Sequence, residues 1–172
     1  NYKDDKMAKG KALHPRLVAA WTNFASADEK LRGHLDSLQD KRAVAHEALA
    51  LISQAQRPVL YGGGGIALGD AVQDFRTFVD ATQIPTVLTL KGLGALPTRH
   101  PLNLGMLGMH GSRAANLAVQ ESDLLVVVGA RFDDRATGKL AEFAPNARVI
   151  HLDADAYGIS KLRTADIALR GD

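Results

Sequence analysis

Four consecutive glycines, Gly62 to Gly65, follow directly after the short apolar run at residues 58–61. Glycine reaches positive φ angles, and it leaves no Cβ between the backbone and an approaching phosphate. A first strand that ends in such a turn is typical of α/β folds that hold a nucleotide-type ligand at the carboxyl ends of parallel strands. A glycine-rich turn can also serve only to reverse the chain direction. The segments downstream must therefore show whether this turn belongs to a nucleotide-binding site.

Strand-like and helix-like segments alternate after the glycines. The run Leu124–Val128 is apolar at every position, as expected of a parallel strand that is buried on both faces. The other strand candidates are 59–61, 85–89, 148–152 and 167–169, and helical spacing covers 71–81 and 112–120. This alternation predicts a doubly wound parallel α/β sheet.

The composition excludes several classes of protein and site. The chain of 172 residues has a net charge of only +2, which predicts neither nucleic acid nor a membrane as a partner. It contains no cysteine, so disulfides, thiolate catalysis and cysteine zinc sites are excluded. No apolar run approaches the length of a membrane span and no signal peptide is visible, so we expect a cytoplasmic protein.

The first 42 residues differ in character from the rest and are interpreted as a helical leader of uncertain origin. Asn1–Asp5 resembles an altered epitope tag, and Ser26 with Glu29 forms a capping-box pattern that predicts a helix starting near Ala27. One apolar face is predicted for Leu31, Leu35, Leu38, Ala45, Leu49 and Ile52. Such a face either covers the main domain, which we assign to residues 43–172, or forms a seam for self-association.

The loops that follow the strands of a doubly wound sheet meet along one edge. Five such segments are rich in glycine, methionine or charged residues: Gly63–Gly65, Thr89–Gly94, Leu104–Gly111, Gly129–Arg135 and Asp153–Asp155. Arg131 or Arg135 can offer a bidentate partner to a pyrophosphate, and Asp153 suits ribose hydroxyls. A flat ring can lie on the apolar side chains of the third segment, Met106, Leu107 and Met109.

Structural roles compete with several of these assignments. Asp133 and Asp134 are more typical of a helix cap or an arginine partner than of a catalytic pair, and His110 can be satisfied within its loop. The histidines lack metal-ligand spacing, and neither a nucleophile elbow nor a Walker-type loop occurs. The glycines also depart from the Gly-x-Gly-x-x-Gly pattern, which argues against an ordinary NAD-binding module.

Four segments together resemble the central domain of the acetolactate synthase (acetohydroxyacid synthase) catalytic subunit, in its bacterial forms. They are Arg57–Tyr61 with the glycines, Thr89–Gly94, Leu104–Gly111, and Gly129–Arg135 followed by Thr137–Lys139. The resemblance covers residues 43–172 and implies a Rossmann-like parallel sheet of six strands, as in thiamine-diphosphate enzymes. A middle domain of another thiamine-dependent carboligase or oxidase, and a non-catalytic nucleotide-binding or assembly module, remain as alternatives.

The resemblance implies that this domain binds FAD. Carried over position by position, the cofactor-binding residues are Gly63, Gly64, Gly65, Thr89, Leu90, Leu107, Gly108, Met109, His110, Gly129, Ala130, Arg131, Asp133, Asp134, Arg135, Asp153, Ala154 and Asp172. Asp153, Ala154 and Asp172 would lie near the adenosine end. No residue is assigned a catalytic or metal-binding role.

The resemblance further implies a parent enzyme that condenses two pyruvates, or pyruvate and 2-ketobutyrate, in branched-chain amino-acid biosynthesis. Its chemistry belongs to thiamine diphosphate and Mg²⁺, held by flanking domains, while the FAD does no redox work in the main reaction. The thiamine-activating glutamate and the Gly-Asp-Gly metal motif of those domains are not matched here, so we expect this chain alone not to be catalytic. The expected partners are the flavin, the other domains, further copies in a homo-oligomer and a possible regulatory subunit.

Overall fold

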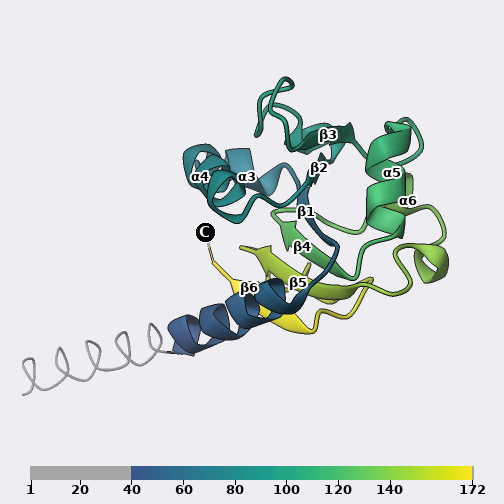
Figure 1. Ribbon diagram of the computed structural model, residues 1–172. Helices are drawn as coiled ribbons and strands as arrows, with labels where there is room; N and C mark the ends of the chain where they lie inside the picture. The colour runs from purple at the N-terminus through teal and green to yellow at the C-terminus, as the bar shows by residue number, and fades with distance from the viewer. Residues whose placement is uncertain (1–39, 172) are drawn as a thin grey trace, which may run out of the picture. The chain divides into compact units, whose positions relative to one another are not determined.

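The computed structural model describes residues 40–171, and the part from residue 43 onward forms one compact unit built on a parallel sheet (Figure 1). The predicted helix start near Ala27 and the predicted site residue Asp172 lie outside the described residues. The strands are β1 (Pro58–Gly62), β2 (Thr86–Leu88), β3 (Asn103–Met106), β4 (Leu124–Val128), β5 (Arg148–Asp153) and β6 (Ile167–Arg170). The helices are residues 40–54, α3 (Gly65–Leu68), α4 (Val72–Thr82), α5 (Arg113–Gln120) and α6 (Asp134–Thr137), with 3₁₀ turns η1 (Leu90–Gly92) and η2 (Leu140–Glu142).

The six strands are all parallel and follow the order β3-β2-β1-β4-β5-β6. The chain order therefore reverses at β1, which pairs with β2 on one side and with β4 on the other. In such sheets the connections diverge at this switch point, and ligands bind outside the carboxyl ends of the strands there. The predicted doubly wound, six-stranded fold is confirmed.

Strand β3 was not recognised as a strand from the sequence, which placed residues 104–111 in a glycine- and methionine-rich loop. The register between β2 and β3 shifts, because Thr86 pairs with Asn103 whereas Val87 pairs with Gly105. Gly105 adopts a φ of 92°, a conformation that L side chains rarely adopt. A short strand with a central glycine and an irregular register lacks the apolar alternation that marks a strand in sequence.

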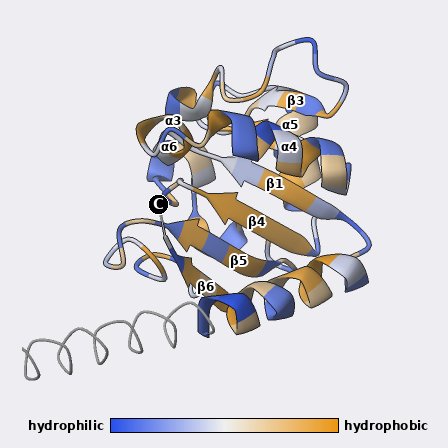
Figure 2. Ribbon diagram, turned by 90° about the vertical axis from the view of Figure 1, so that its left-hand side faces the viewer, coloured by the Kyte–Doolittle hydropathy of each residue, from blue (hydrophilic) through white to orange (hydrophobic). Residues whose placement is uncertain are grey.

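Two apolar layers cover the two faces of the sheet. One layer packs Phe75 and Val79 of α4 against Leu60 and Leu88, and the other packs Ala115 and Val119 of α5 against the opposite face. Strand β4 contributes to both layers and is hydrophobic along its length (Figure 2). A five-residue strand covered on both faces fixes the position of its carboxyl end, where the candidate site lies.

From residue 43 onward, the helix at residues 40–54 covers the first of these layers. Val44, Ala48, Leu51 and Ile52 pack there, so the prediction of a covering helix is confirmed for this stretch. The predicted face was wrong at Leu49, which is 52% exposed, because the buried stripe runs one position earlier than the 4-3 count from Ala45. The division between leader and domain at residue 42, and the separate origin of the leader, stay predictions.

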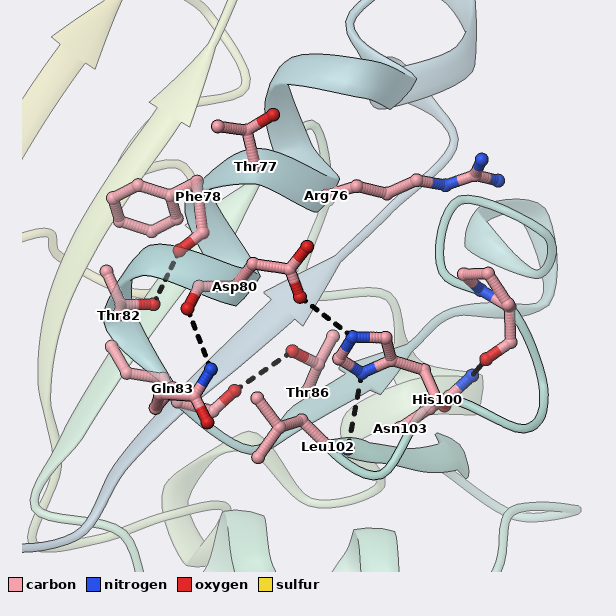
Figure 3. Close-up of polar contacts among 12 residues, drawn as sticks. Arg76, Thr77, Phe78, Asp80, Thr82, Gln83, Thr86, His100, Leu102 and Asn103 are labelled. Atoms are coloured by element: carbon pink, nitrogen blue, oxygen red, sulfur yellow. Dashed lines mark hydrogen bonds and ion pairs between the residues drawn. The ribbon is translucent and has the colours of Figure 1, made fainter.

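Side chains hold the connections near the amino ends of β2 and β3 (Figure 3). His100 contacts the Asp80 carboxylate through Nε2 at 3.0 Å, and its Nδ1 accepts a hydrogen bond from the Leu102 backbone N–H at 3.3 Å. Asn103 donates through its side-chain nitrogen to the carbonyls of Leu96 and Pro97. Both nitrogens of His100 are thus engaged in structure.

Candidate functional site at the carboxyl ends of the strands

The loops at the carboxyl ends of the strands are joined to one another by backbone hydrogen bonds. Leu107 donates to the carbonyl of Leu88, and Thr89 to that of Gly62. The series continues across the switch point from Gly63 to Val128 and from Gly129 to Leu152, each at 2.9 Å, and from Gly171 to Asp153 at 3.3 Å. The five predicted segments therefore lie along a single rim, which we call the carboxyl rim.

The glycines of the first loop allow two backbones to pack against each other. A Cβ on Gly63 would lie 2.2 Å from the Gly129 carbonyl oxygen, and one on Gly65 would lie 2.6 Å from the Gly129 Cα. Gly65 also donates its N–H to that oxygen at 2.9 Å. The structure thus gives a second reason for glycine in this tract. The close packing of the two loops leaves no space for a side chain, in addition to the space for a phosphate that the sequence suggested.

The third segment reaches the fourth in the same manner. Gly108, with a φ of 97°, would place a Cβ 2.5 Å from the Arg135 carbonyl oxygen, which accepts a hydrogen bond from Met109 N–H at 3.1 Å. Met109 is 77% exposed and Leu90 of the second segment is 71% exposed, so both apolar side chains are available at the rim. His110 is exposed as well.

Two predicted contact residues lack available side chains. Leu107 and Ala130 are each 4% exposed and pack in the second apolar layer, so the prediction that the Leu107 side chain forms part of an apolar binding surface was wrong. Its position directly after β3 turns it into the core. Thr89 is half-buried, and its Oγ1 accepts a hydrogen bond from Gly92 N–H at 3.0 Å, which caps η1.

A hollow of about 240 Å³ lies between α3 and the ends of β5 and β6. It brings together four of the predicted residues, Gly65, Gly129, Asp153 and Ala154, with apolar side chains that include Ile66 and Leu68. The Asp153 carboxylate accepts a hydrogen bond from Asp155 N–H at 2.9 Å through Oδ1. One carboxylate beside an apolar wall suits a group that combines a flat ring with hydroxyls.

Arg131 does not line that hollow. It lines a second one, of about 190 Å³, together with Phe132, Asp133, Gly158, Lys161 and Leu162. Lys161 therefore brings a second cation near Arg131, and sequence reasoning missed it. Lys161 lies within the long connection between β5 and β6, away from any strand end or motif, so no signal pointed to it.

The acidic pair serves the local backbone. Asp133 is the N-cap of α6, and both Asp133 and Asp134 accept hydrogen bonds from Arg135 N–H, at 3.2 and 2.8 Å. The Arg135 backbone N–H, with help from Asp134 and the nearby arginines, lowers the pKa of Asp133 below its usual range. The helix-cap interpretation of this pair is confirmed.

Two buried polar side chains beneath the rim were not singled out by sequence reasoning. The Tyr61 hydroxyl on β1 donates to the Arg131 carbonyl at 3.2 Å, and His151 Nε2 on β5 lies 2.9 Å from the Ala130 carbonyl. Burial, with a smaller contribution from Asp133, raises the pKa of Tyr61, so its phenol remains a donor. In sequence, both residues occupy strand positions that are typical of core packing.

Neither a metal centre nor a membrane span is found in the described range. Residues 40–171 hold no group of three or more His, Cys, Asp or Glu side chains placed to bind a metal ion. Over the same residues, the helices are too short or too polar to cross a membrane.

Sequence comparison identifies relatives of this domain. Residues 45–172 match the family described as thiamine pyrophosphate enzyme, central domain, and residues 1–57 match a protein family of unknown function, DUF3829. The acetolactate synthase isozyme 2 large subunit of Escherichia coli K12 is 55% identical over 130 residues, which are 76% of this chain and 24% of that protein. The Mycobacterium bovis acetolactate synthase is 48% identical over 143 residues, 83% of this chain and 23% of its own.

A third relative gives the same result. The large subunit of acetolactate synthase from Parasynechococcus marenigrum is 52% identical over 130 residues, which are 76% of this chain and 21% of that protein. The chain thus spans less than a quarter of the length of these three relatives. The predicted resemblance to the central domain of acetolactate synthase catalytic subunits is confirmed, and the chain belongs to the family of thiamine pyrophosphate enzyme central domains.

Proposed function

We propose that this chain is the FAD-binding central domain of an acetolactate synthase catalytic subunit. The observation that carries the proposal is the carboxyl rim, where hydrogen bonds from Leu107 through Gly63 to Gly129 and Leu152 join the strand ends in one line. An extended dinucleotide needs such a continuous line of contacts outside the carboxyl ends of parallel strands. The 48–55% identity to acetolactate synthase large subunits supports the choice of enzyme.

The side chains along the rim fit FAD. Arg131 is exposed beside Lys161, as a pyrophosphate requires, and Asp153 offers a carboxylate to ribose hydroxyls in its own hollow. Exposed Met109 and Leu90 provide apolar surface for a flat ring system. These residues would hold the cofactor, and the remaining predicted contacts would be made through the backbone.

The activity that we propose for the parent protein is the thiamine-diphosphate-dependent condensation of two pyruvates, or of pyruvate with 2-ketobutyrate. FAD supplies no electron transfer to this carbon–carbon bond formation, and the residues of the rim bind and orient it. Because residues 45–172 match the central domain alone, we propose that this chain does not catalyse the condensation by itself. Other domains of the subunit, a second copy, a regulatory subunit and a cytoplasmic location complete the proposal.

Titration of the full chain with FAD tests this function. Flavin fluorescence and calorimetry should detect saturable binding, weaker than in a complete flavoenzyme, since neighbouring domains would add contacts. Arg131→Ala should weaken binding by about 1.5–3 kcal/mol, which is the cost of a lost charge-assisted hydrogen bond. Arg99→Ala, an exposed arginine between η1 and β3, is the matched control and should leave the dissociation constant unchanged.

The outcomes separate the candidate functions. Saturable binding that depends on Arg131 supports the flavin domain, and His110→Ala should then have the smaller effect. A chain that shows no flavin binding but associates with itself in sedimentation would favour the non-catalytic assembly module instead.

A further inference from the structure

Three successive carbonyls after β4 all accept hydrogen bonds from within the domain. Gly129 accepts from Gly65 N–H at 2.9 Å, Ala130 pairs with His151 Nε2 at 2.9 Å, and Arg131 accepts from the Tyr61 hydroxyl at 3.2 Å. Two of the three donors come from the strands that flank β4, since Tyr61 lies on β1 and His151 on β5, whereas Gly65 begins α3. The backbone that carries Arg131 is therefore held from both sides.

The aromatic ring of Phe132 lies against both donor residues. Its centroid is 5.9 Å from that of Tyr61 and 5.7 Å from that of His151, with interplanar angles of 78° and 86°. Tyr61 is fully buried and His151 is 1% exposed. A buried hydroxyl or imidazole is costly unless it is hydrogen-bonded, so these two bonds resist being broken.

The protonation of His151 follows from its partner. A carbonyl oxygen only accepts hydrogen bonds, so Nε2 carries the proton that it donates to Ala130. Nδ1 is buried and has no partner among the described residues. Burial lowers the pKa of His151, against smaller opposing contributions from the Ala130 bond and from Asp153, which favours the neutral imidazole.

The clamp formed by Tyr61 and His151 leaves the donors of this loop free. The peptide unit is planar and trans, so the N–H that follows each carbonyl points away from it. Within residues 40–171, the N–H groups of Arg131 and Phe132 take part in no hydrogen bond. The Arg131 side chain is exposed and lines the hollow that also contains Lys161.

We propose that Tyr61 and His151 are positioning residues of the rim, which hold the carbonyls of Arg131 and Ala130 inward and thereby aim the Arg131 guanidinium at the phosphates of the dinucleotide. The proposal rests on the proposed FAD-binding function and adds two residues to it. Neither residue touches the ligand. Their effect on binding passes through Arg131.

A double-mutant cycle on the full chain tests the clamp. Tyr61→Phe removes only the hydroxyl and should weaken FAD binding about three- to tenfold, the change that corresponds to one neutral hydrogen bond. In the Arg131→Ala background, Tyr61→Phe should change the dissociation constant by less than about twofold, because the residue through which it acts is gone. A merely structural hydroxyl would have the same effect in both backgrounds.

Ser122→Ala is the matched control for stability. Ser122 is 1% exposed, lies before β4 at the opposite end of the sheet, and donates its hydroxyl to the Val119 carbonyl at 2.7 Å. It should lower the melting temperature about as much as Tyr61→Phe and leave FAD binding unchanged. Equal losses of FAD affinity in the two variants would overturn the clamp.

Substitutions of His151 test the clamp independently, because one of them can keep the hydrogen-bond donor and another cannot. His151→Gln can keep an N–H donor for the Ala130 carbonyl, whereas His151→Leu cannot, so FAD affinity should fall further in His151→Leu. If His151→Leu does not fold, the Tyr61 cycle alone decides. Additive effects of Tyr61→Phe and Arg131→Ala would refute the clamp and leave the FAD function standing, whereas a wild-type chain that binds no FAD would refute both.

Discussion

Backbone hydrogen bonds link the strands at both ends of the parallel sheet, but the side chains that assist them differ between the two ends. At the amino end, side chains bind the backbone: the Asp123 carboxylate accepts hydrogen bonds from Gln56 and Arg57 N–H at 2.7 and 2.9 Å, and Asp166 accepts from Val149 N–H at 2.8 Å. At the carboxyl end, backbone N–H and carbonyl groups join the successive loops, and the Tyr61 and His151 side chains support one of these loops from beneath. There Gly63 and Gly65 allow one loop to pack directly on the next.

This difference determines which side chains are free to bind a ligand. The carboxylates at the amino end are engaged by backbone donors that would otherwise lack partners, so their role is structural. At the carboxyl end, backbone contacts position the loops, and charged side chains such as Arg131 and Lys161 remain at a hollow. The division that we propose here, between a stabilising end and a ligand-binding end, is found in other parallel α/β folds.

The largest effect on stability is expected from Gly63→Ala at the carboxyl end. The new Cβ would lie 2.2 Å from the Gly129 oxygen and 2.6 Å from the Ala130 Cα, both backbone atoms that cannot rotate away. We expect the free energy of unfolding to fall by about 3 kcal/mol, measured by urea denaturation. Gly171→Ala is the control, since its Cβ would meet no atom within 4 Å, and an equal loss there would contradict the packing role.

At the amino end, Asp123→Ala should lower the free energy of unfolding by about 2 kcal/mol, because two N–H groups lose a charged acceptor. Burial opposes ionisation of Asp123, but the N–H groups of Gln56 and Arg57 prevail and lower its pKa. A carboxylate with a lowered folded pKa contributes stability above its unfolded pKa of about 3.9, and this is lost as the pH falls through the folded pKa. The difference in the free energy of unfolding between wild type and Asp123→Ala should therefore close at strongly acidic pH. Replacement of the exposed Glu121 by alanine is the control, and it should leave the free energy of unfolding nearly unchanged at neutral pH.

The architecture could be predicted from the sequence where a local hydrophobic pattern marks the strand or helix. Leu124–Val128 is apolar throughout because β4 is covered on both faces, and the following loops could be placed on one edge from topology alone. Strand β3 was missed because Gly105 and a shifted register remove its alternation. Leu49 was assigned to the wrong face, because residue type alone does not distinguish an exposed leucine from the buried apolar residues next to it in the helix.

The site was predicted less completely because several of its contacts are long-range. The Tyr61 hydroxyl meets a carbonyl 70 positions away, and His151 meets one 21 positions away, so no local spacing reveals either bond. Arg131 was predicted from its motif, whereas Lys161 reaches the same hollow from a connection without one. The role of the glycines could be only half anticipated, since the partner of Gly63 is a loop 66 positions further along the chain.

His151, beneath the carboxyl end, should have a smaller effect on stability, which appears as the pH of the solution is lowered. Its folded pKa is lowered by burial, so the unfolded chain binds a proton first and stability falls as the pH drops below the unfolded value of about 6.5. One group can contribute at most about 1.4 kcal/mol per pH unit. Thermal unfolding of the wild type and His151→Gln between pH 7.5 and 5.5 should show a smaller slope in the variant. Equal slopes would mean that this imidazole does not titrate on unfolding.

The smallest change in stability is expected for Arg131→Ala at the carboxyl rim. The Arg131 side chain is exposed, and among the hydrogen bonds and ion pairs of residues 40–171 it supplies none. We therefore expect the free energy of unfolding to change by less than about 0.5 kcal/mol, although FAD binding should weaken markedly. Urea denaturation without flavin, beside Asp123→Ala under the same conditions, measures the contrast. A loss as large as that of Asp123→Ala would show that Arg131 supports the fold, and the separation between a stabilising end and a ligand-binding end would then not hold for this residue.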